Sequence, residues 1–297
     1  MLTRQMQQPL TSNTYTLSAS PDRLGWLIPT DPHQSPSVLR EQYRAQGYLW
    51  LKGIIDRENV LDFRRRFFEA LVDTGLLAEG TTPVEGIYSG NGKGRVTKIL
   101  TEIVQWASYE AFCLTPEIWQ FYEDLLGGPV YLHKRKLIRV TTLDDSCTGA
   151  HYDLTYLRAG TDRVCTSWIP IGDIPVEMGG LVYLEGSDAL GRQLEAEFSA
   201  KNAQLPPEER INAYNKNMSE TGWLTKDLPS LANRLNSRWL MADYEAGDMV
   251  VHSPYMIHAS TTNTRVTMRL STDIRYQLVR DAIDPRWTTN WSPDDNL

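Results

Sequence analysis

The sequence predicts a mainly β fold with flanking α-helices, in the form of a jelly-roll or cupin-like β-barrel within one domain. Two observations lead to this prediction. Helix signals cluster in the first half of the chain, whereas the second half contains many short β-prone runs separated by Gly, Pro, Asp or Asn. Short strands with helical support are typical of barrels and jelly rolls. No internal repeat or linker divides the 297 residues.

The first segment, residues 1–34, is polar and contains four prolines that interrupt any periodicity. A polar segment without regularly spaced apolar positions has no face to bury in a core. We therefore expect residues 1–34 to form an N-terminal arm over the surface, and residues 35–297 to form a single domain.

Three helices are predicted from their boundary signals, over residues 36–46, 57–74 and 116–126. The first and third begin with proline at the first helical position, directly after Ser35 and Thr115. Asp56 can cap the second helix, and each of the three is followed by a glycine that can end it. These helices supply the apolar faces expected to support the strands.

The strands are predicted in the second half of the chain, where runs rich in Val, Ile, Leu, Tyr and Thr are short. They lie at residues 130–132, 137–140, 164–169, 180–184, 248–252 and 266–276. Residues 188–238 interrupt the series with sequence rich in Glu, Asn and Lys. We expect this segment to be a helical insertion between two strands.

Composition excludes several classes of partner. The formal net charge is −7, which argues against nucleic acid or an anionic membrane as the main partner. No run of 18 apolar residues and no secretory signal is visible. The three cysteines, Cys113, Cys147 and Cys165, form no CxxC pair, which excludes a disulfide scaffold and a thiolate zinc site. A reducing, cytoplasmic location is expected.

The first chemical motif is the H-x-D formed by His151, Tyr152 and Asp153. Two residues apart on a strand, the imidazole and the carboxylate would project from the same face. Together they could share one metal ion, as in the two-His, one-carboxylate sites of non-haem Fe(II) oxygenases. The motif alone is equally compatible with a strand histidine that is hydrogen-bonded to a neighbouring aspartate.

A third ligand should come from a distant strand, and the candidates are His252 and His258. Arg269 follows His258 by eleven residues, within the alternating run 266–276. An arginine at this position could bind a carboxylate through a bidentate salt bridge. Taken by itself, Arg269 could also be an arginine on the surface of a strand.

Several motifs together resemble the phytanoyl-CoA dioxygenase family over about residues 38–280. The H-x-D motif and Arg269 are two of these features, and the others are Gly47–Gly53, Val96–Ile99, Leu114–Pro129, Ser167–Ile171, Met178–Ser187, Gly247–His252, Ile257–Ser260 and Asn263. The joint pattern is specific, although each piece is loose. The resemblance implies a double-stranded β-helix that uses Fe(II), 2-oxoglutarate and dioxygen to oxidise a small molecule.

The resemblance also implies roles for individual residues. His151, Asp153 and His258 would bind the iron, and Arg269 would bind the distal carboxylate of 2-oxoglutarate. Four further residues would line the co-substrate: Lys98, Leu137, Trp168 and Ser260. His252 is expected to pack beside the site. The chain departs from the family at Met178 and Asp188, where many members have Asn and His. We therefore expect the rim of the active site, and hence the substrate, to differ from those of such members.

The function expected is oxidation, by default hydroxylation, of a C–H bond of a small organic metabolite, with release of succinate and carbon dioxide. Secondary-metabolite biosynthesis is the expected context. The mouth of the site is expected to include Tyr88, Trp106, Tyr156 and Trp223. Two alternatives stay open: a cupin-type metal enzyme that does not use 2-oxoglutarate, and a non-catalytic metal- or ligand-binding barrel. Arg269 argues against the first, and the complete ligand set argues against the second.

Overall fold

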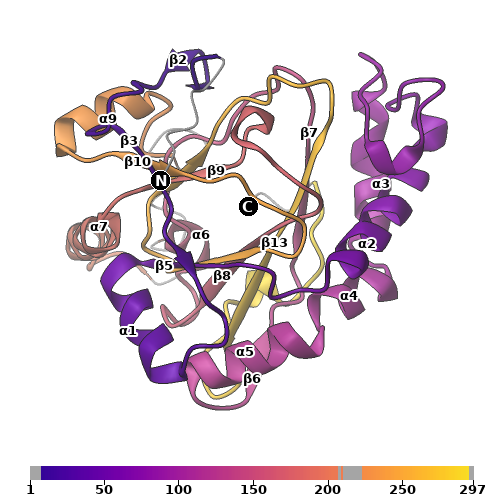
Figure 1. The fold of residues 1–297 in the computed structure, drawn as a ribbon. Helices are drawn as coiled ribbons and strands as arrows, with labels where there is room; N and C mark the ends of the chain where they lie inside the picture. Colours follow the sequence, from indigo (N-terminus) through magenta and orange to yellow (C-terminus); the bar gives the residue numbers. More distant parts are fainter. Residues whose placement is uncertain (1–7, 207–208, 210–222, 294–297) are drawn as a thin grey trace.

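The fold consists of two β-sheets that face each other, with helices packed on the outside (Figure 1). The computed structural model describes residues 8–206, residue 209 and residues 223–293. One sheet has seven strands and the other has four, and a two-stranded hairpin, β1 (Thr11–Ser12) and β2 (Tyr15–Thr16), precedes them. Within the described residues the sheets do not join into a closed barrel. The predicted class, mainly β with flanking helices, is confirmed.

The seven-stranded sheet has the order β4-β5-β11-β8-β13-β6, and β7 also pairs with β13. Its strands are β4 (Pro29–Thr30), β5 (Tyr48–Leu51), β6 (Val130–Leu132), β7 (Leu137–Thr141), β8 (Cys165–Pro170), β11 (Met249–His252) and β13 (Arg269–Leu278). The four-stranded sheet has the order β12-β9-β10-β3. Its strands are β3 (Leu24–Trp26), β9 (Leu181–Leu184), β10 (Trp239–Met241) and β12 (His258–Ser260). All six predicted strand runs contain or overlap a strand.

Strand β13 shows how the seven-stranded sheet separates core from site. Because successive side chains point to opposite faces, Leu270 and Ile274 join the apolar core on the outer face. Arg269 and Arg275 point to the other side, which we call the inner face because it looks toward the four-stranded sheet. Arg269, for example, donates a hydrogen bond to the carbonyl of Gly179, just before β9.

Helices cover the outer face of this sheet (Figure 1). They are α1 (Pro36–Gln46), α2 (Arg57–Glu69), α3 (Val96–Ile103), α4 (Ala107–Cys113) and α5 (Pro116–Leu126). Phe63 of α2 stacks on Tyr109 of α4 with ring centroids 5.3 Å apart, and Tyr122 of α5 stacks on Tyr276 of β13 at 4.3 Å. Such aromatic contacts, with the buried apolar residues around them, hold the helices on the sheet.

The helix boundaries agree with their sequence signals. The side chain of Asp56 accepts a hydrogen bond of 3.0 Å from the backbone N–H of Asn59 and so caps α2. Helix α1 ends at Gly47, whose φ of 77° lies in the left-handed region that favours glycine. The predicted helix over 57–74 is divided: α2 ends at Glu69, and a short 3₁₀ helix covers Val72–Thr74.

The N-terminal segment is more integrated than the predicted surface arm. Strand β3 pairs in parallel with β10, and β4 pairs in parallel with β5. The described part of residues 1–34 therefore adds one edge strand to each sheet. Runs of two or three residues have no detectable period, so the sequence contained no signal for them.

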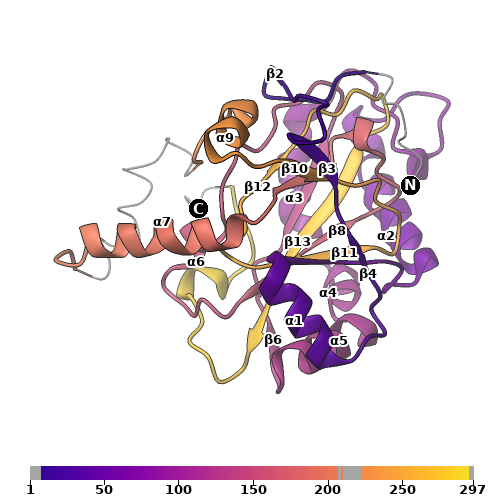
Figure 2. The same ribbon diagram turned by 60° about the vertical axis from the view of Figure 1, so that its left-hand side comes forward.

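The segment between β9 and β10 is helical in its described part. It contains α7 (Ser187–Lys201) and α9 (Leu228–Leu235), and α7 extends away from the sheets (Figure 2). The rest of the predicted insertion lies largely outside the described residues. A short helix, α6 (Leu154–Leu157), follows the H-x-D motif. No described helix is both long and apolar enough to cross a membrane.

Candidate metal and co-substrate site

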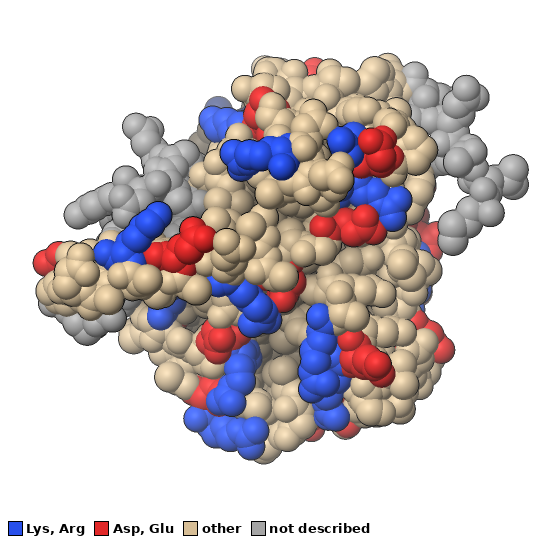
Figure 3. Space-filling model, turned by 90° about the vertical axis from the view of Figure 1, so that its left-hand side faces the viewer, with Lys and Arg blue, Asp and Glu red and all other residues tan. Residues whose placement is uncertain are grey.

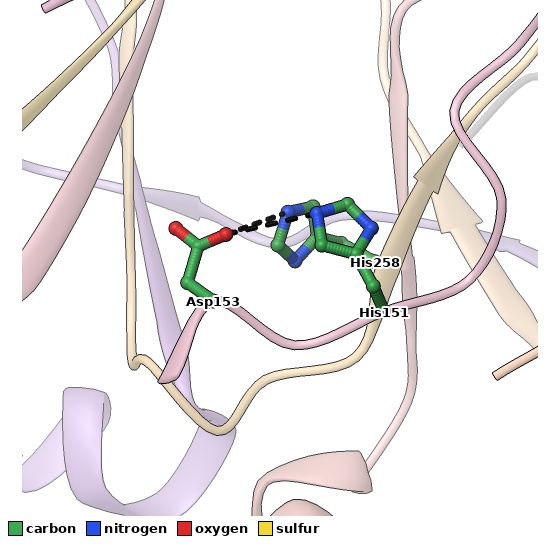
Figure 4. Close-up of side chains that lie close together, drawn as sticks. All are labelled: His151, Asp153 and His258. Carbon is green, nitrogen blue, oxygen red and sulfur yellow. Dashed lines mark ion pairs between the residues drawn. The ribbon is translucent and has the colours of Figure 1, made fainter. Parts of the chain in front are cut away.

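The three residues expected to bind a metal converge between the sheets. One ligand atom from each of His151, Asp153 and His258 lies within 4.8 Å of the others, and all three residues are buried. Figure 4 shows both imidazoles directed toward the same carboxylate oxygen. His258 is the first residue of β12, and His151 forms an isolated antiparallel bridge with it. The backbone therefore sets the positions of both histidines.

Asp153 reaches the site by a different route from the one expected. It is not on a strand: its backbone is helical, with φ −67° and ψ −29°, and it directly precedes α6. A turn into this helix, rather than strand alternation, brings the carboxylate beside His151, and Tyr152 between them is fully buried. The expected strand placement of the H-x-D motif is wrong, although its two side chains do meet.

Each imidazole is oriented by a backbone carbonyl. The Nδ1 of His151 lies 2.9 Å from the carbonyl oxygen of Gly149, and the Nδ1 of His258 lies 2.9 Å from that of Met256. A carbonyl only accepts, so both Nδ1 atoms carry the proton and donate it. This leaves each Nε2 with a free lone pair, 3.7 Å from Oδ1 of Asp153. Metal-binding histidines are typically held in this way.

The protonation states also suit a cation. Burial lowers the pKa of His151, and it lowers that of His258 well below the ordinary value, with further lowering from His151 and His252. For Asp153, burial raises the pKa, but the positive charge of Arg275 and the neighbouring imidazoles hold it well below its usual range. The site therefore offers two neutral imidazoles and one carboxylate.

The second oxygen of Asp153 is held on the side away from the two ligand imidazoles. Oδ2 accepts hydrogen bonds from the hydroxyl of Thr166 and, at 2.9 Å, from Nη2 of Arg275. Nε2 of His252 lies 3.4 Å from the same oxygen, and Nδ1 of His252 lies 3.2 Å from the Tyr183 hydroxyl. These contacts leave Oδ1 facing His151 and His258. His252 thus packs behind the carboxylate, as expected for a supporting residue.

Arg269 is buried on the inner face without an acidic partner. Its Nη1 donates to the carbonyl of Gly179 at 2.6 Å, and its Nη2 and Nε donate to Oγ1 of Thr141 at 2.8 and 3.2 Å. Among the described residues, no carboxylate lies within 4.0 Å of its guanidinium. Burial lowers its pKa to about 10. Each Nη keeps one N–H, so the guanidinium can still bind a carboxylate with both nitrogens.

Other residues of the inner face also have buried polar atoms without a hydrogen-bond partner. In the described part of the chain, the indole Nε1 of Trp168, Oγ of Ser271 and both Nε and Nη1 of Arg275 are buried without a hydrogen-bond partner. All three residues occupy inner-face positions of β8 and β13. Buried polar atoms left in this state cost free energy unless a ligand or water binds them. The indole N–H of Trp168 and the hydroxyl of Ser271 fit an acceptor-rich dianion such as 2-oxoglutarate, whereas the guanidinium of Arg275 lies over the ring of Trp287. The triad fits Fe(II).

The other expected co-substrate residues differ in their placement. Ser260 is buried in β12, and its Oγ accepts a 2.8 Å hydrogen bond from the backbone N–H of Thr148. Leu137 lies opposite Asp273 across the β7–β13 pair, on the inner face. Lys98, by contrast, is exposed on α3, and no described contact joins its side chain to the triad. Its role in binding the co-substrate stays a prediction.

The aromatic residues expected at the mouth fall into two groups. The ring of Tyr156 lies 6.0 Å from that of His151, and a Cβ added to Gly149 would meet the ring of Trp223 at 2.8 Å. Both aromatics therefore lie near the triad. Tyr88 and Trp106 instead pack against the apolar core on the outer face.

Sequence reasoning did not assign Thr141, Thr166 and Arg275 to the site. The two-residue alternation of β13 could have placed Arg275 at the site, because Arg275 must share one face of the strand with Arg269, Ser271 and Asp273. The two threonines hold Arg269 and Asp153 in position through contacts between distant strands. No spacing rule indicates such contacts.

A hollow at the surface has none of the three proposed metal ligands in its lining. It has a volume of about 530 Å³ and lies between α1, the end of α5 and α7. Its lining includes Arg40, Arg44, Arg163 and Arg192, but Arg163 is paired with Asp281 and Arg192 with Asp188. Figure 3 shows that Lys and Arg alternate with Asp and Glu over this face. The hollow therefore has no strong excess of positive charge.

Residues 43–270 match the model of the phytanoyl-CoA dioxygenase family. The 1-deoxypentalenic acid 11-beta-hydroxylase of Streptomyces arenae is 26% identical over 245 residues, which cover 79% of this chain and 78% of the relative. The enzyme of the same name from Streptomyces exfoliatus is 23% identical over 244 residues, with the same shares covered.

Solved structures show the same fold. The non-haem α-ketoglutarate-dependent carbocyclase SnoK from nogalamycin biosynthesis has a TM-score of 0.57 and 20% identity, covering 91% of this chain and 92% of its own. The epimerase SnoN, solved with Fe³⁺, α-ketoglutarate and nogalamycin RO, has a TM-score of 0.56 and 17% identity, covering 84% and 86%. EctD from S. alaskensis with bound Fe has a TM-score of 0.55 and 14% identity, covering 92% and 89%.

Proposed function

Because the chain belongs to the phytanoyl-CoA dioxygenase family, we propose that it is an Fe(II)- and 2-oxoglutarate-dependent dioxygenase that oxidises a C–H bond of a small organic metabolite. Hydroxylation is the default outcome. The observation that carries the proposal is the joint geometry of the site. Two neutral imidazoles and one carboxylate converge, and a buried arginine without an acidic partner lies on the inner face of the same fold.

The chain's own residues take defined parts in this reaction. Nε2 of His151, Nε2 of His258 and Oδ1 of Asp153 would hold the iron. Arg269, positioned by Thr141, would bind the distal carboxylate of 2-oxoglutarate. When bound, iron and 2-oxoglutarate supply the oxidising chemistry, with dioxygen as co-substrate and succinate and carbon dioxide as products.

Supporting residues would keep this arrangement fixed during turnover. Thr166 and Arg275 bind Oδ2 of Asp153, which directs Oδ1 toward the two ligand imidazoles. The indole N–H of Trp168 and the hydroxyl of Ser271 are available to hydrogen-bond the co-substrate. Fixed donors of this kind orient a ligand without reorganising when it reacts. The protein thus determines which C–H bond lies closest to the oxidant.

The relatives support a role in secondary metabolism. Two of them are named as hydroxylases of 1-deoxypentalenic acid, and two similar structures are a carbocyclase and an epimerase from nogalamycin biosynthesis. We therefore place the substrate among the small organic metabolites of secondary metabolism. Tyr156 and Trp223, which lie near the triad, would offer aromatic surface to such a substrate.

The test is conversion of 2-oxoglutarate into succinate by the purified protein. Succinate should form only when Fe(II) and dioxygen are both present, and a chelator should stop the reaction. Asp153→Ala should be inactive, whereas a control variant at an exposed position of α1, Arg44→Gln, should keep full activity. A wild-type protein that leaves 2-oxoglutarate unchanged would support the cupin-type or non-catalytic alternative.

A further inference from the structure

Arg139 lies on the inner face of β7, beside the co-substrate residues. Across the β7–β13 pair, Arg139 is opposite Ser271, whereas its neighbours Thr141 and Leu137 are opposite Arg269 and Asp273. Residues directly opposite in an antiparallel pair project from the same face. Arg139 therefore shares the inner face with Arg269, but Arg139 is neither a proposed iron ligand nor a proposed 2-oxoglutarate residue.

The end of the Arg139 side chain is free to bind a ligand. Its Nε donates one hydrogen bond of 3.2 Å to Oδ2 of Asp273, and neither Nη makes a hydrogen bond with any described residue. The side chain is 47% exposed, although Asp273 beside it is only 12% exposed. Arg139 is thus reached by solvent and keeps the pair of nitrogens that matches a carboxylate.

Arg139 also acts electrostatically on Arg269, its neighbour on the inner face. Burial is the main cause of the lowered pKa of Arg269, and the positive charge of Arg139 is the second cause. The pairing of Arg139 with Ser271, two residues along β13 from Arg269, agrees with this proximity. Arg139 therefore lies within electrostatic range of the proposed 2-oxoglutarate anchor.

The arginines of the inner face differ in what they contact. Arg275 is paired with Asp153, and Arg269 is buried, with the carboxylates of Asp273 and Asp145 among the charges that act on it. Arg139 is the guanidinium of the three that solvent reaches, and it makes a single hydrogen bond, to Asp273. It is therefore the arginine that can meet a carboxylate on a molecule that enters from solvent.

We propose that Arg139 binds a carboxylate of the substrate, so that the substrate class is an organic acid with an apolar body. The proposal rests on the proposed function and narrows it. Leu137 and Tyr156 pack against one apolar cluster near the site and would contact the body of the acid. The relatives named above act on a substrate that is itself named as an acid, which supports the assignment.

The experiment measures binding, so that it does not depend on turnover. Wild-type protein with Mn(II) and 2-oxoglutarate is titrated with matched pairs of alicyclic acids and their methyl esters, from cyclohexanecarboxylic acid to 1-deoxypentalenic acid. In at least one pair the acid should bind about tenfold or more tightly than its ester, because only the acid forms the charge-assisted bond. Arg139→Gln should remove this preference, and Arg139→Lys should keep part of it.

Two further variants test whether the preference for acids depends on Arg139. Asp273→Asn removes the carboxylate that competes for Arg139, so it should keep or increase the preference for acids. Arg44→Gln, on the exposed side of α1, should change nothing. If no acid binds more tightly than its ester, or if the preference survives in Arg139→Gln, the proposal is overturned.

The affinity for 2-oxoglutarate is titrated in the same variants. Arg139→Gln should change it less than threefold, whereas a large loss would assign Arg139 to the co-substrate instead and would also overturn the proposal. Failure of the proposed function has a different signature. In that case the wild-type protein forms no Fe(II)-dependent succinate, whichever ligand Arg139 binds.

Discussion

His151 and His258 lie opposite each other in an antiparallel bridge and exchange both backbone hydrogen bonds, at 3.0 and 2.9 Å. Their rings lie 4.3 Å apart, and each is oriented by a carbonyl two residues before it. The spacing of the two imidazoles is therefore a property of the backbone.

Removal of either histidine should consequently abolish metal binding and leave the fold intact. His151→Ala and His258→Ala are expected to lose Fe(II) binding and succinate formation, because two ligands hold the ion too weakly. Titration with Co(II), followed by absorbance, would measure metal binding, and circular dichroism would show whether the variant stays folded. His252→Ala is the matched control and should still bind metal. An active His258→Ala beside an inactive His252→Ala would show that the ligand assignment is wrong.

Arg269→Leu should weaken the use of 2-oxoglutarate. Loss of a buried partner for a carboxylate costs roughly 3 kcal/mol, which corresponds to an increase in KM of at least about a hundredfold. Steady-state kinetics with varied 2-oxoglutarate concentration would measure this change in KM. Arg265→Leu is the control, because Arg265 is half exposed and pairs with Glu177. An unchanged KM in Arg269→Leu would place the anchor elsewhere.

His133 should make the protein sensitive to acid. Burial lowers its pKa to about 4, partly offset by its hydrogen bond to Gln277. Because the folded pKa is lowered, the unfolded chain takes up this proton first, and stability is lost as the pH falls below about 6.5 toward 4. Between about pH 7.5 and 5, wild type should lose about 2 kcal/mol more than His133→Leu. Urea unfolding at both pH values measures this difference, and equal losses would contradict it.

Asp153 should prevent halogenation. A carboxylate that occupies an iron coordination site and balances the charge of Fe(II) leaves no room there for chloride. We therefore expect oxygenation, desaturation or a related C–H oxidation by the unmutated enzyme, even in high chloride or bromide. Mass spectrometry of the product would show whether it contains a halogen. A chlorinated or brominated product would remove Asp153 from the proposed ligand set.

Much of the fold could be predicted because its signals are local. Asp56 marks the start of α2 through its side chain, and Gly47 marks the end of α1 through its backbone. Both boundaries form where expected, although α2 ends before the predicted residue 74. The two-residue alternation of β13 likewise separates core residues from inner-face residues. Such features depend on a few neighbouring positions, so one sequence is sufficient to find them.

The parts that could not be predicted depend on contacts between distant residues. Asp153 was expected on a strand, because nothing in H-x-D shows that the chain turns into a helix there. Arg275 and Thr166 support its carboxylate from two other strands, which only the folded sheet brings together. Lys98 matched a family pattern but is exposed on α3. Sequence position alone does not state which side of a helix faces a site.

Edge strand β3 has a consequence for how the chain reaches its native state. Leu24 of β3 pairs with Trp239 of β10, and the hydroxyl of Ser12 donates a hydrogen bond to the carbonyl of Ser260, 248 residues later. This part of the chain must therefore wait until most of the protein has been synthesised before it finds these partners, unlike β4, whose partner β5 follows closely in the sequence. Closing such long loops is slow. Strand β3 therefore completes the four-stranded sheet at one of the last steps of folding.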